Sequence, residues 1–541
     1  MLNEYLEIEK LQSDLKEFIN AYHFLFTQID SDRPIPIFND KKLLAKLHHS
    51  LNLDKYRQSS FRKKLLLGAP SNQIIDFAKR IKINYGSYEE TQTVEFRNKL
   101  ATFHWGNNSD TRDFIEAFGY RDYLIPLEND DVFATRDIMC HDDPFKQLKD
   151  YQANVVFRAL DIIKNPNSKF LIHMPTGAGK TRVAMEIISH FLNDNKTRQV
   201  IWLADCRELC EQAMDAFIRV WSHLGKHSIK TYRIWGKVPI PKCLESSAFA
   251  VAMYQKVRTS LDDNSKLKAD FLVTDEAHIA ITPTYSDTIN KLKERRTRQT
   301  RIMGLTATPG RGFGMIEENE VLGSFFNFNI IGIDDEGGTI EHLQQKGVLA
   351  RCQREVLNPE IEYTLTKEEW EKIGRNYELE FPDGLLETIA NDQKRNLKII
   401  LRLLKMTDEY KRVIVFCGSV HQSKLLASFI DTCGYPAAYV DGTSPEAYRK
   451  DVVHKFQNGN IQFLFNYNVF TAGFDVPQID AVVIARPTKS VVLYGQMIGR
   501  GMRGPQLGGT TVFTLVDVVD NILTEYGGLD TVYEYFTEYW K

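Results

Sequence analysis

The sequence predicts an α/β architecture in which two consecutive parallel-sheet domains follow a helical N-terminal domain. Two observations predict this fold class. Apolar, β-rich runs alternate with helical stretches from about residue 146 onward, and a glycine-rich loop at 174–181 directly follows one of those runs. Such alternation is typical of a parallel sheet whose strands are joined by crossover helices. A chain of 541 residues has room for roughly three or four domains.

The composition excludes several classes of protein. Hydrophobic residues make up 43% and charged residues 26% of the chain, which is typical of a globular protein, and the net charge is −3. The whole molecule is therefore no polycation, and any nucleic-acid contact must come from local grooves. The seven cysteines include no CxxC pair, which disfavours a zinc site or a disulfide framework. Because the N-terminus is acidic and no apolar run approaches the roughly 18 residues of a membrane span, we expect a cytoplasmic protein.

Residues 1–145 are expected to form a helical accessory domain, because apolar residues near the N-terminus recur at helical spacing. The segment 41–64 is rich in Lys, Arg and His with interleaved aromatic residues. Two interpretations stay open for it. It is either a contact for a duplex or a partner, or the solvated side of helices whose leucines face a core. The pair His48-His49 has no nearby cysteine or carboxylate, so we expect no metal there.

The first α/β domain is expected at 146–350, and its phosphate-binding loop at 174–181 reads Met-Pro-Thr-Gly-Ala-Gly-Lys-Thr. Glycines let such a loop turn its N–H groups toward phosphate oxygens, with a helix N-terminus behind them. The lysine adds a positive charge, and the threonine offers a hydroxyl to Mg²⁺. The glycine that usually opens this pattern is Met174 here. The loop residues expected to hold ATP are Thr176, Gly177, Ala178, Gly179, Lys180 and Thr181.

A second element of the same chemistry follows about a hundred residues later. The apolar run 271–274 leads into Asp275-Glu276-Ala277-His278. Asp275 at the end of a strand can hold Mg²⁺ together with Thr181, and Glu276 can orient and deprotonate an attacking water. A lone Gly-Lys-Thr is often an ordinary turn, but the two elements together predict an ATP hydrolase that uses ATP and Mg²⁺.

A connector with a helical insert is expected at 351–408 and a second α/β domain at 409–541, with a cleft between the two α/β domains. The second domain must then supply charge to the γ-phosphate. The segment 494–503 fits this need, because Gln496, Arg500 and Arg503 are spaced to lie on one side of a helix. The alternative is a basic solvated helix, although the glycines and the glutamine in this run disfavour it.

Taken in order, these elements resemble the motifs of superfamily 2 helicases and translocases with an Asp-Glu-Ala-His box. The resemblance covers about 145–525, and its forms are similar to those of the motor (Res) subunits of type I and type III restriction enzymes and of prokaryotic anti-phage defence helicases. It implies two RecA-like domains and nucleic acid as a partner, with DNA favoured over RNA. The matching segments are Tyr151-Gln152, 174–181, 203–209, 275–278, Thr306-Ala307-Thr308-Pro309, 413–416, 471–477 and 496–503.

The resemblance also implies roles for single residues. Gln152 would read the adenine edge, and Tyr151 or Phe145 would stack on the ring. His278 and Thr306 would couple the nucleotide site to the nucleic acid. Gly473 and Asp475 would line the cleft and belong to the nucleotide site. Phosphate-backbone contacts would come from Arg207, Thr308, Thr443, Arg449 and Thr471, although an ordinary structural role is an equal alternative for each of them.

The sequence departs from the family pattern in two places, which concern the nucleic-acid contact and the nuclease. Asp205-Cys206 stands where a Pro-Thr pair is usual, which puts an acidic residue close to the expected strand path. The nuclease pattern of restriction motors has no convincing copy, since 95–99 is a poor match and the chain ends soon after the last motif. We therefore expect a motor without its own nuclease that serves a separate nuclease or effector bound through 1–145. An ATP-gated sensor or clamp and an RNA helicase remain the alternatives.

Overall fold

The structure is a computed structural model, and it describes most of the chain between residues 58 and 528 together with two N-terminal helices. None of the helices in this described part is long and apolar enough to cross a membrane. The described residues are 8–15, 41–51, 58–105, 109–118, 134–138, 147–261, 267–294, 300–307, 316–333, 339–364, 368, 381, 383–469, 476, 478–488, 490–524 and 527–528.

An eight-stranded sheet forms the first α/β domain, and all of its strand pairs are parallel except the one that β1 makes with β4. Every residue of β3 and β6 is buried, as expected for strands covered by helices on both faces. The strands in spatial order are β1 (Thr135–Ile138), β4 (Ile229–Ile234), β5 (Ala248–Met253), β3 (Gln199–Ala204), β6 (Phe271–Thr274), β7 (Arg301–Thr306), β2 (Lys169–His173) and β8 (Ile330–Ile331).

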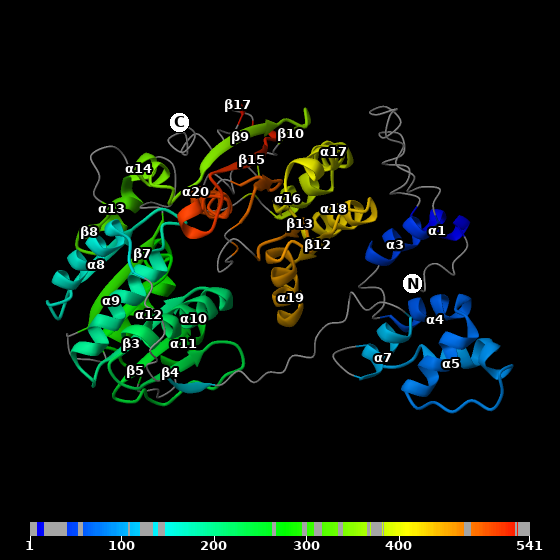
Figure 1. Ribbon diagram of the computed structural model, residues 1–541, viewed down its shortest axis with the longest axis horizontal. Coiled ribbons are helices and arrows are strands. Elements are labelled where there is room, and N and C mark those ends of the chain that lie inside the picture. Colours follow the sequence, from blue (N-terminus) through cyan, green and yellow to red (C-terminus); the bar gives the residue numbers. More distant parts are fainter. Residues whose placement is uncertain are drawn as a thin grey trace.

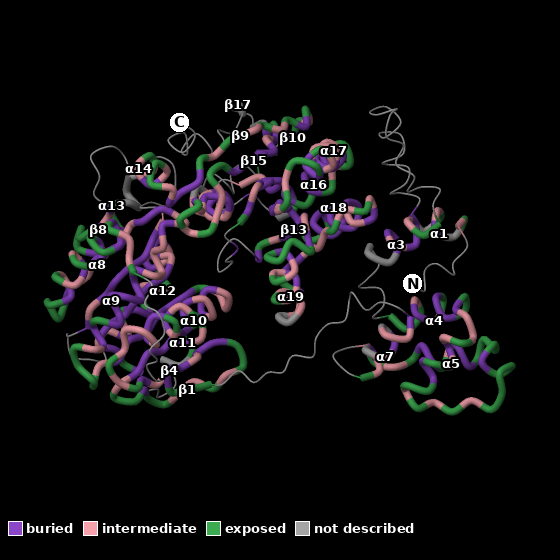
Figure 2. The backbone as a smooth tube through the Cα atoms, in the orientation of Figure 1, coloured by how far each residue is buried: buried purple, intermediate pink, exposed green. Residues whose placement is uncertain are grey.

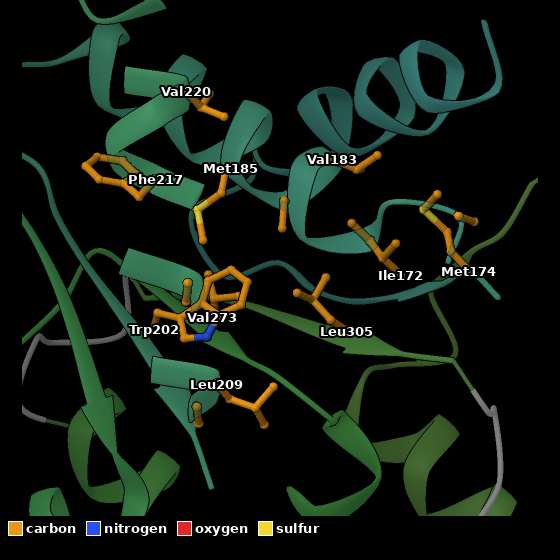
Figure 3. Packing of buried hydrophobic residues seen from close by; sticks show 14 of the residues in the cluster. Ile172, Met174, Val183, Met185, Trp202, Leu209, Phe217, Val220, Val273 and Leu305 are labelled. Atoms are coloured by element: carbon orange, nitrogen blue, oxygen red, sulfur yellow. The ribbon is translucent and has the colours of Figure 1, made fainter. Parts of the chain in front are cut away.

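Helices cover both faces of this sheet, because successive strand residues point to opposite sides. Figure 3 shows Met185 and Phe217 packed over Trp202 and Val273 on one face, whereas Ile201 of the same strand joins the core on the other face. The first face carries α8 (Asp150–Ile162), α9 (Lys180–Asp194) and α10 (Arg207–Leu224), and the opposite face carries α11 (Tyr254–Leu261), α12 (Pro283–Glu294) and α13 (Ile316–Phe325). The short helices η6 (Ala277–Ile279) and α14 (Thr339–Gln345) follow β6 and β8.

A six-stranded, fully parallel sheet forms the second α/β domain. Its order is β12 (Ala437–Val440), β13 (Phe463–Asn466), β11 (Val413–Phe416), β14 (Ala481–Ile484), β15 (Val512–Val518) and β9 (Arg351–Leu357). One face packs against α17 (Gln393–Glu409) and α18 (Val420–Thr432), and the other against α19 (Glu446–Gln457) and α20 (Val491–Ile498). Figure 2 shows both sheets as buried layers beneath partly exposed helices. The expected pair of α/β domains is therefore present.

The segment 351–408, expected as a connector, supplies two elements to the second domain. β9 pairs with β15 along its full length, and α17 lies in the core beneath α18. Arg395 of α17 is fully buried and makes a two-pronged ion pair with Asp520, with Nε–Oδ1 and Nη2–Oδ2 distances of 2.6 and 2.8 Å. The remainder packs beside a small sheet. This remainder contains α16 (Asp383–Asn391) and β10 (Glu362–Thr364). The small sheet has the strand order β10, β16 (Asn521–Thr524) and β17 (Gly527–Gly528), and α16 packs against it.

The region 1–145 is distributed over three places rather than forming one helical unit. Helices α1 (Ile8–Asp14) and α3 (Lys41–Leu51) join the core of the second domain beside α18, where Lys46 pairs with Asp431 at 2.8 Å. β1 adds an edge strand to the first sheet. Between them, Figure 1 shows a separate group of helices. The group contains α4 (Ser59–Gly68), α5 (Ser71–Arg80), η4 (Glu90–Gln92), α6 (Val94–Leu100) and α7 (Ser109–Ala117) around an aromatic core of their own.

Part of the basic segment 41–64 has a structural role. Arg62 is 2% exposed, donates to the carbonyl oxygens of Ala101 and Phe103 at 3.1 and 2.7 Å, and lies over the Phe103 ring. His48 is buried as well. Arg62 and His48 therefore do not lie on a solvated helix side, and both interpretations stay predictions for the other basic residues, of which Lys55 and Arg57 lie outside the described residues.

Candidate functional site

The phosphate-binding loop leaves the carboxyl end of β2 and enters α9. Gly177 and Gly179 both have a φ of +86°, a left-handed conformation that L side chains rarely adopt. A Cβ atom on Gly179 would lie only 2.5 Å from Nε2 of Gln152. Both glycines are thus required by conformation, and Gly179 also by a close neighbour. The loop with its helix N-terminus forms the cradle that phosphate groups need.

The tyrosine and glutamine at the start of α8, which precedes β2, support this loop. Gln152 Nε2 and the Tyr151 hydroxyl both donate to the carbonyl oxygen of Ala178, at 3.1 and 3.0 Å. Gln152 Oε1 accepts from the backbone N–H of Lys149 at 3.1 Å. Tyr151 is buried, so its contact to the loop is through the hydroxyl. Adenine recognition by Gln152 stays a prediction, and Phe145 lies outside the described residues.

The acidic pair lies at the carboxyl end of β6, two strands away from the loop in the sheet. Glu276 has a φ of +47° and its N–H donates to Asp275 Oδ1 at 3.1 Å. A non-glycine residue in this region carries strain of roughly 1–3 kcal/mol, which is often found at functional sites. Burial, and next the charge of Glu276, raise the pKa of Asp275 to about 7. Two carboxylates held together away from water form a site that a cation would stabilise.

Lys180 joins this carboxylate pair from the other side of the loop. Burial lowers its pKa, the charges of Glu276 and Asp275 oppose that effect, and the charge of Arg500 adds to it. Four charged groups from three segments therefore act on one another in one place. Among the described residues no group of His, Cys, Asp and Glu forms a metal site by itself. A magnesium ion here would instead use Asp275 and the Thr181 hydroxyl, as in other phosphate loops.

Arg500 and Arg503 reach the site from the second domain, but they do not lie on a helix. α20 ends at Ile498, and the next backbone bonds close short turns, from Arg500 N to Met497 O at 3.2 Å. The expectation of one shared helix face is therefore wrong. Burial lowers the pKa of Arg500 to about 10, against the opposing charge of Glu276. Burial also lowers the pKa of Arg503, while Gln496 remains on α20, half-buried.

The residues expected to couple the site to nucleic acid lie beside it. His278 Nδ1 is 3.5 Å from Glu276 Oε2, and the carbonyl oxygen of buried Thr306 accepts from the N–H of Met174 at 3.2 Å. His173, which we did not predict, lies 3.2 Å through Nε2 from the Ala307 carbonyl oxygen. It ties the strand of the phosphate loop to the Thr306 segment. Its place directly before the loop was the only available sequence signal.

Three of the expected backbone contacts have partners within the protein. Arg207 Nε donates to Glu211 at 3.0 Å. Arg449 forms an ion pair with Glu208 on the opposite wall of the cleft, and Thr443 donates twice to Asp441 at 2.7 Å. Their contact with nucleic acid stays a prediction. Thr308, Thr471, Gly473 and Asp475 lie outside the described residues.

A cleft of about 500 Å³ separates α10 from α19 and reaches the phosphate loop. Charged side chains of both signs line its walls, together with Gly179 and Thr181 of the phosphate loop and Arg503. Nearby, the Tyr285 hydroxyl binds the Asp205 carboxylate. This acidic residue in the place of the usual Pro-Thr pair is thus held by a tyrosine of α12. The family pattern could not have predicted that contact.

Comparisons with known proteins match both halves of this site. The family of the type III restriction enzyme res subunit matches residues 145–311, and the helicase conserved C-terminal domain matches 395–504. The yeast (Saccharomyces cerevisiae) protein described as "Putative ATP-dependent helicase IRC3" is 26% identical over 378 residues, which are 67% of this chain and 50% of that protein. The chain thus spans only about half the length of this relative.

Two further relatives extend the comparison. The ATP-dependent DNA helicase uvsW of Enterobacteria phage T4 is 22% identical over 462 residues, covering 81% of this chain and 83% of the phage protein. The DNA-bound ATP-dependent Type ISP restriction-modification enzyme LlaBIII has a similar fold, with a TM-score of 0.51 and 17% identity over 73% of this chain and 29% of that chain. Together with the phosphate loop and the arginines that face it, these matches show that the chain belongs to the superfamily 2 ATP-dependent helicases and is related to the Res subunits of restriction enzymes.

Proposed function

We propose that the chain is an ATP-driven motor that moves along DNA. One observation carries this proposal: the arginines of the second domain pack against the phosphate loop of the first. A Cβ atom on Gly177 of the loop would lie 3.6 Å from Arg503 Cγ, and the charge of Arg500 acts on Lys180 and that of Glu276 on Arg500. Such an arrangement makes hydrolysis depend on the closed cleft, because the arginine stabilises transition-state charge only when the two domains meet. A site that works only when closed can convert each turnover into a movement of one domain against the other.

ATP with Mg²⁺ would supply the γ-phosphoryl group whose transfer to water drives the motor. The loop N–H groups and Lys180 would bind phosphate oxygens, while Thr181 and Asp275 would hold the ion. Glu276 takes the proton of the attacking water, whose oxygen bonds to the γ-phosphorus as the bond to the leaving ADP breaks. Arg500 and Arg503 offset the charge that builds up on the transferring group. A buried carboxylate beside a second one fits a divalent cation, which would offset the burial and the repulsion that raise the pKa of Asp275.

DNA is proposed as the track because of the relatives. The phage T4 protein is named as a DNA helicase and matches most of this chain, and the family matched at 145–311 is that of a restriction-enzyme subunit. A separate nuclease or effector bound through the N-terminal region, as in a restriction-like or anti-phage system, belongs to this proposal. The docking of α1 and α3 on the second domain supports a mechanical link between that region and the motor.

Steady-state ATP hydrolysis, measured alone and with single- and double-stranded DNA and RNA, tests the proposal. We expect stimulation by DNA and displacement of a strand or of a triplex-forming oligonucleotide, and Lys180→Ala should abolish both. Stimulation by RNA alone would contradict the DNA assignment and favour an RNA helicase. ATP-dependent DNA binding without any displacement would instead favour the sensor or clamp.

A further inference from the structure

The chain passes from the first domain to the second through a short linker segment, residues 347–351. This segment runs beside the arginine segment, residues 499–511, which joins α20 to β15. Backbone bonds connect the two: Gly504 N to Val348 O at 2.8 Å and Ala350 N to Met502 O at 2.8 Å. An antiparallel bridge pairs Leu349 with Arg503 itself. The linker is therefore bonded directly to the backbone that carries the arginines.

The two segments approach so closely that no side chain fits between them. A Cβ atom on Gly504 would lie 2.3 Å from the carbonyl oxygen of Gly347 and 2.7 Å from the carbonyl carbon of Val348. Both distances are far below any real contact of a Cβ atom. Because the obstructing atoms belong to the backbone of the linker, Gly504 could not be replaced without separating the two segments. The contact thus depends on glycine at this position.

The paired segments also touch the phosphate loop. A Cβ atom on Gly177 would be 3.4 Å from Leu349 Cδ2 and 3.6 Å from Arg503 Cγ. On the other side of the loop, a Cβ atom on Gly499 would collide with Thr176 at 2.2 Å. Leu349 is itself fully buried. The linker and the arginine segment therefore form one packed body against the loop that holds the phosphates.

A buried polar cluster fixes the far end of the same body. Asp517 Oδ2 of β15 accepts from the Tyr494 hydroxyl of α20 and from Arg354 Nη2 of β9, both at 2.7 Å. The cluster thus joins α20, which precedes the arginines, to β15, which follows them, and to β9, which follows the linker. Interactions of this kind, in which a charged group is buried with its partners, hold elements in one geometry. The arginine segment is thus clamped to the linker at both of its ends.

We propose that the linker segment 347–351 is a positioning element for catalysis, so that closing the cleft and presenting Arg500 and Arg503 to the phosphates are one movement. Leu349 and Gly504 are the positioning residues, since they act through the arginines and the loop. This inference rests on the ATP-hydrolysis part of the proposed function and is independent of DNA. A misplacement of about 1 Å at such a site can cost on the order of 100-fold in rate.

The test compares Gly504→Ala with Gly384→Ala, because a Cβ atom on Gly384 would meet nothing within 4 Å. We expect Gly504→Ala to lower kcat for ATP hydrolysis by about 10- to 100-fold, with the KM for ATP and the Kd for ADP within about twofold of the wild type. Gly384→Ala should leave all three near the wild-type values. Leu349→Ala should also lower kcat, and it serves as the second variant if Gly504→Ala fails to fold.

A double-mutant cycle with Arg500→Ala separates positioning from general damage. If the linker acts through the arginine, adding Gly504→Ala or Leu349→Ala to Arg500→Ala should lower kcat by less than about threefold further. The wild type, but neither positioning variant, should bind ADP with aluminium fluoride much more tightly than ADP alone. A folded Gly504→Ala and Leu349→Ala with wild-type kcat, or losses that multiply in full with Arg500→Ala, would overturn the inference. A wild type that does not hydrolyse ATP would refute the proposed function. If it still binds ADP with aluminium fluoride more tightly than ADP alone, the loss of that tighter binding in the two positioning variants would still test the linker.

Discussion

The nucleotide end of the interface between the α/β domains and its other end contain the same kinds of charged residue with different partners. At the nucleotide end, the charges of half-buried Lys180, Glu276 and Arg500 act on one another. At the other end, between α10 and α19, the arginines form partly exposed ion pairs, as Arg449 does with Glu208. The number of arginines between two domains therefore does not reveal their chemistry, whereas the partners of these arginines do.

Arg500→Ala should give the largest effect at the nucleotide end. An arginine supplied across a cleft is worth about 10³- to 10⁵-fold in the rate of phosphoryl transfer, and we expect kcat to fall by at least the lower figure. Arg449→Ala, the same change at the other end, should lower it by less than about fivefold, because the side chain is paired at a partly exposed site. Single-turnover ATP hydrolysis measures both, and equal losses would remove the distinction between the two ends.

Glu276→Gln should lower ATP hydrolysis by about 10²- to 10⁴-fold, because the amide cannot accept the proton of the water. Nucleotide binding should persist, since the phosphates are held by the loop and Lys180. Glu208→Gln at the other end is the matched change and should alter the rate by only a few fold. Near-normal turnover by Glu276→Gln, measured beside its binding of ATP, would show that another group is the base.

Buried and exposed ion pairs of the second domain should also differ in how much they contribute to the free energy of unfolding. Arg395→Leu leaves Asp520 buried without its partner and should lower the free energy of unfolding by about 3–5 kcal/mol. Lys398→Ala on the same helix removes the exposed pair with Glu360 and should cost less than about 1 kcal/mol. Denaturant titration of both variants measures the difference. Similar losses for the two would mean that the buried pair contributes no more than a surface contact.

The smallest expected effect is that of salt on the pair between Arg449 and Glu208. A partly exposed ion pair contributes about 0.2–1 kcal/mol and weakens as the Debye length falls. A double-mutant cycle on Arg449→Ala and Glu208→Gln, read as kcat at low and high ionic strength, should show a coupling that fades with salt. A coupling that stays constant would place this pair with the buried charges instead.

Sequence reasoning worked best in the first domain because its functional residues directly follow buried strands. The loop after β2 and the pair Asp275-Glu276 after β6 must meet at one edge of the sheet once the strands are parallel. No such rule places Arg500 and Arg503. Their helix ends early because the backbone that follows pairs with the linker segment, a contact between residues far apart in the sequence.

Other failures have the same origin. The charged segment 351–408, expected as a connector with a helical insert, contains the strand β9, which the sequence pattern does not predict. β9 is a strand because it pairs with β15. Arg62 lies in a basic run but enters an aromatic core. In each case a long-range contact, absent from any local pattern, decides the role of the residue.

The most direct test of the account is the steady-state ATP hydrolysis of the wild type and of Arg500→Ala, each with and without DNA. We predict that DNA stimulates the wild type and that Arg500→Ala is inactive in both conditions although it still binds ATP. An Arg500→Ala variant that hydrolyses ATP at the wild-type, DNA-stimulated rate would contradict the claim that the second domain completes the catalytic site.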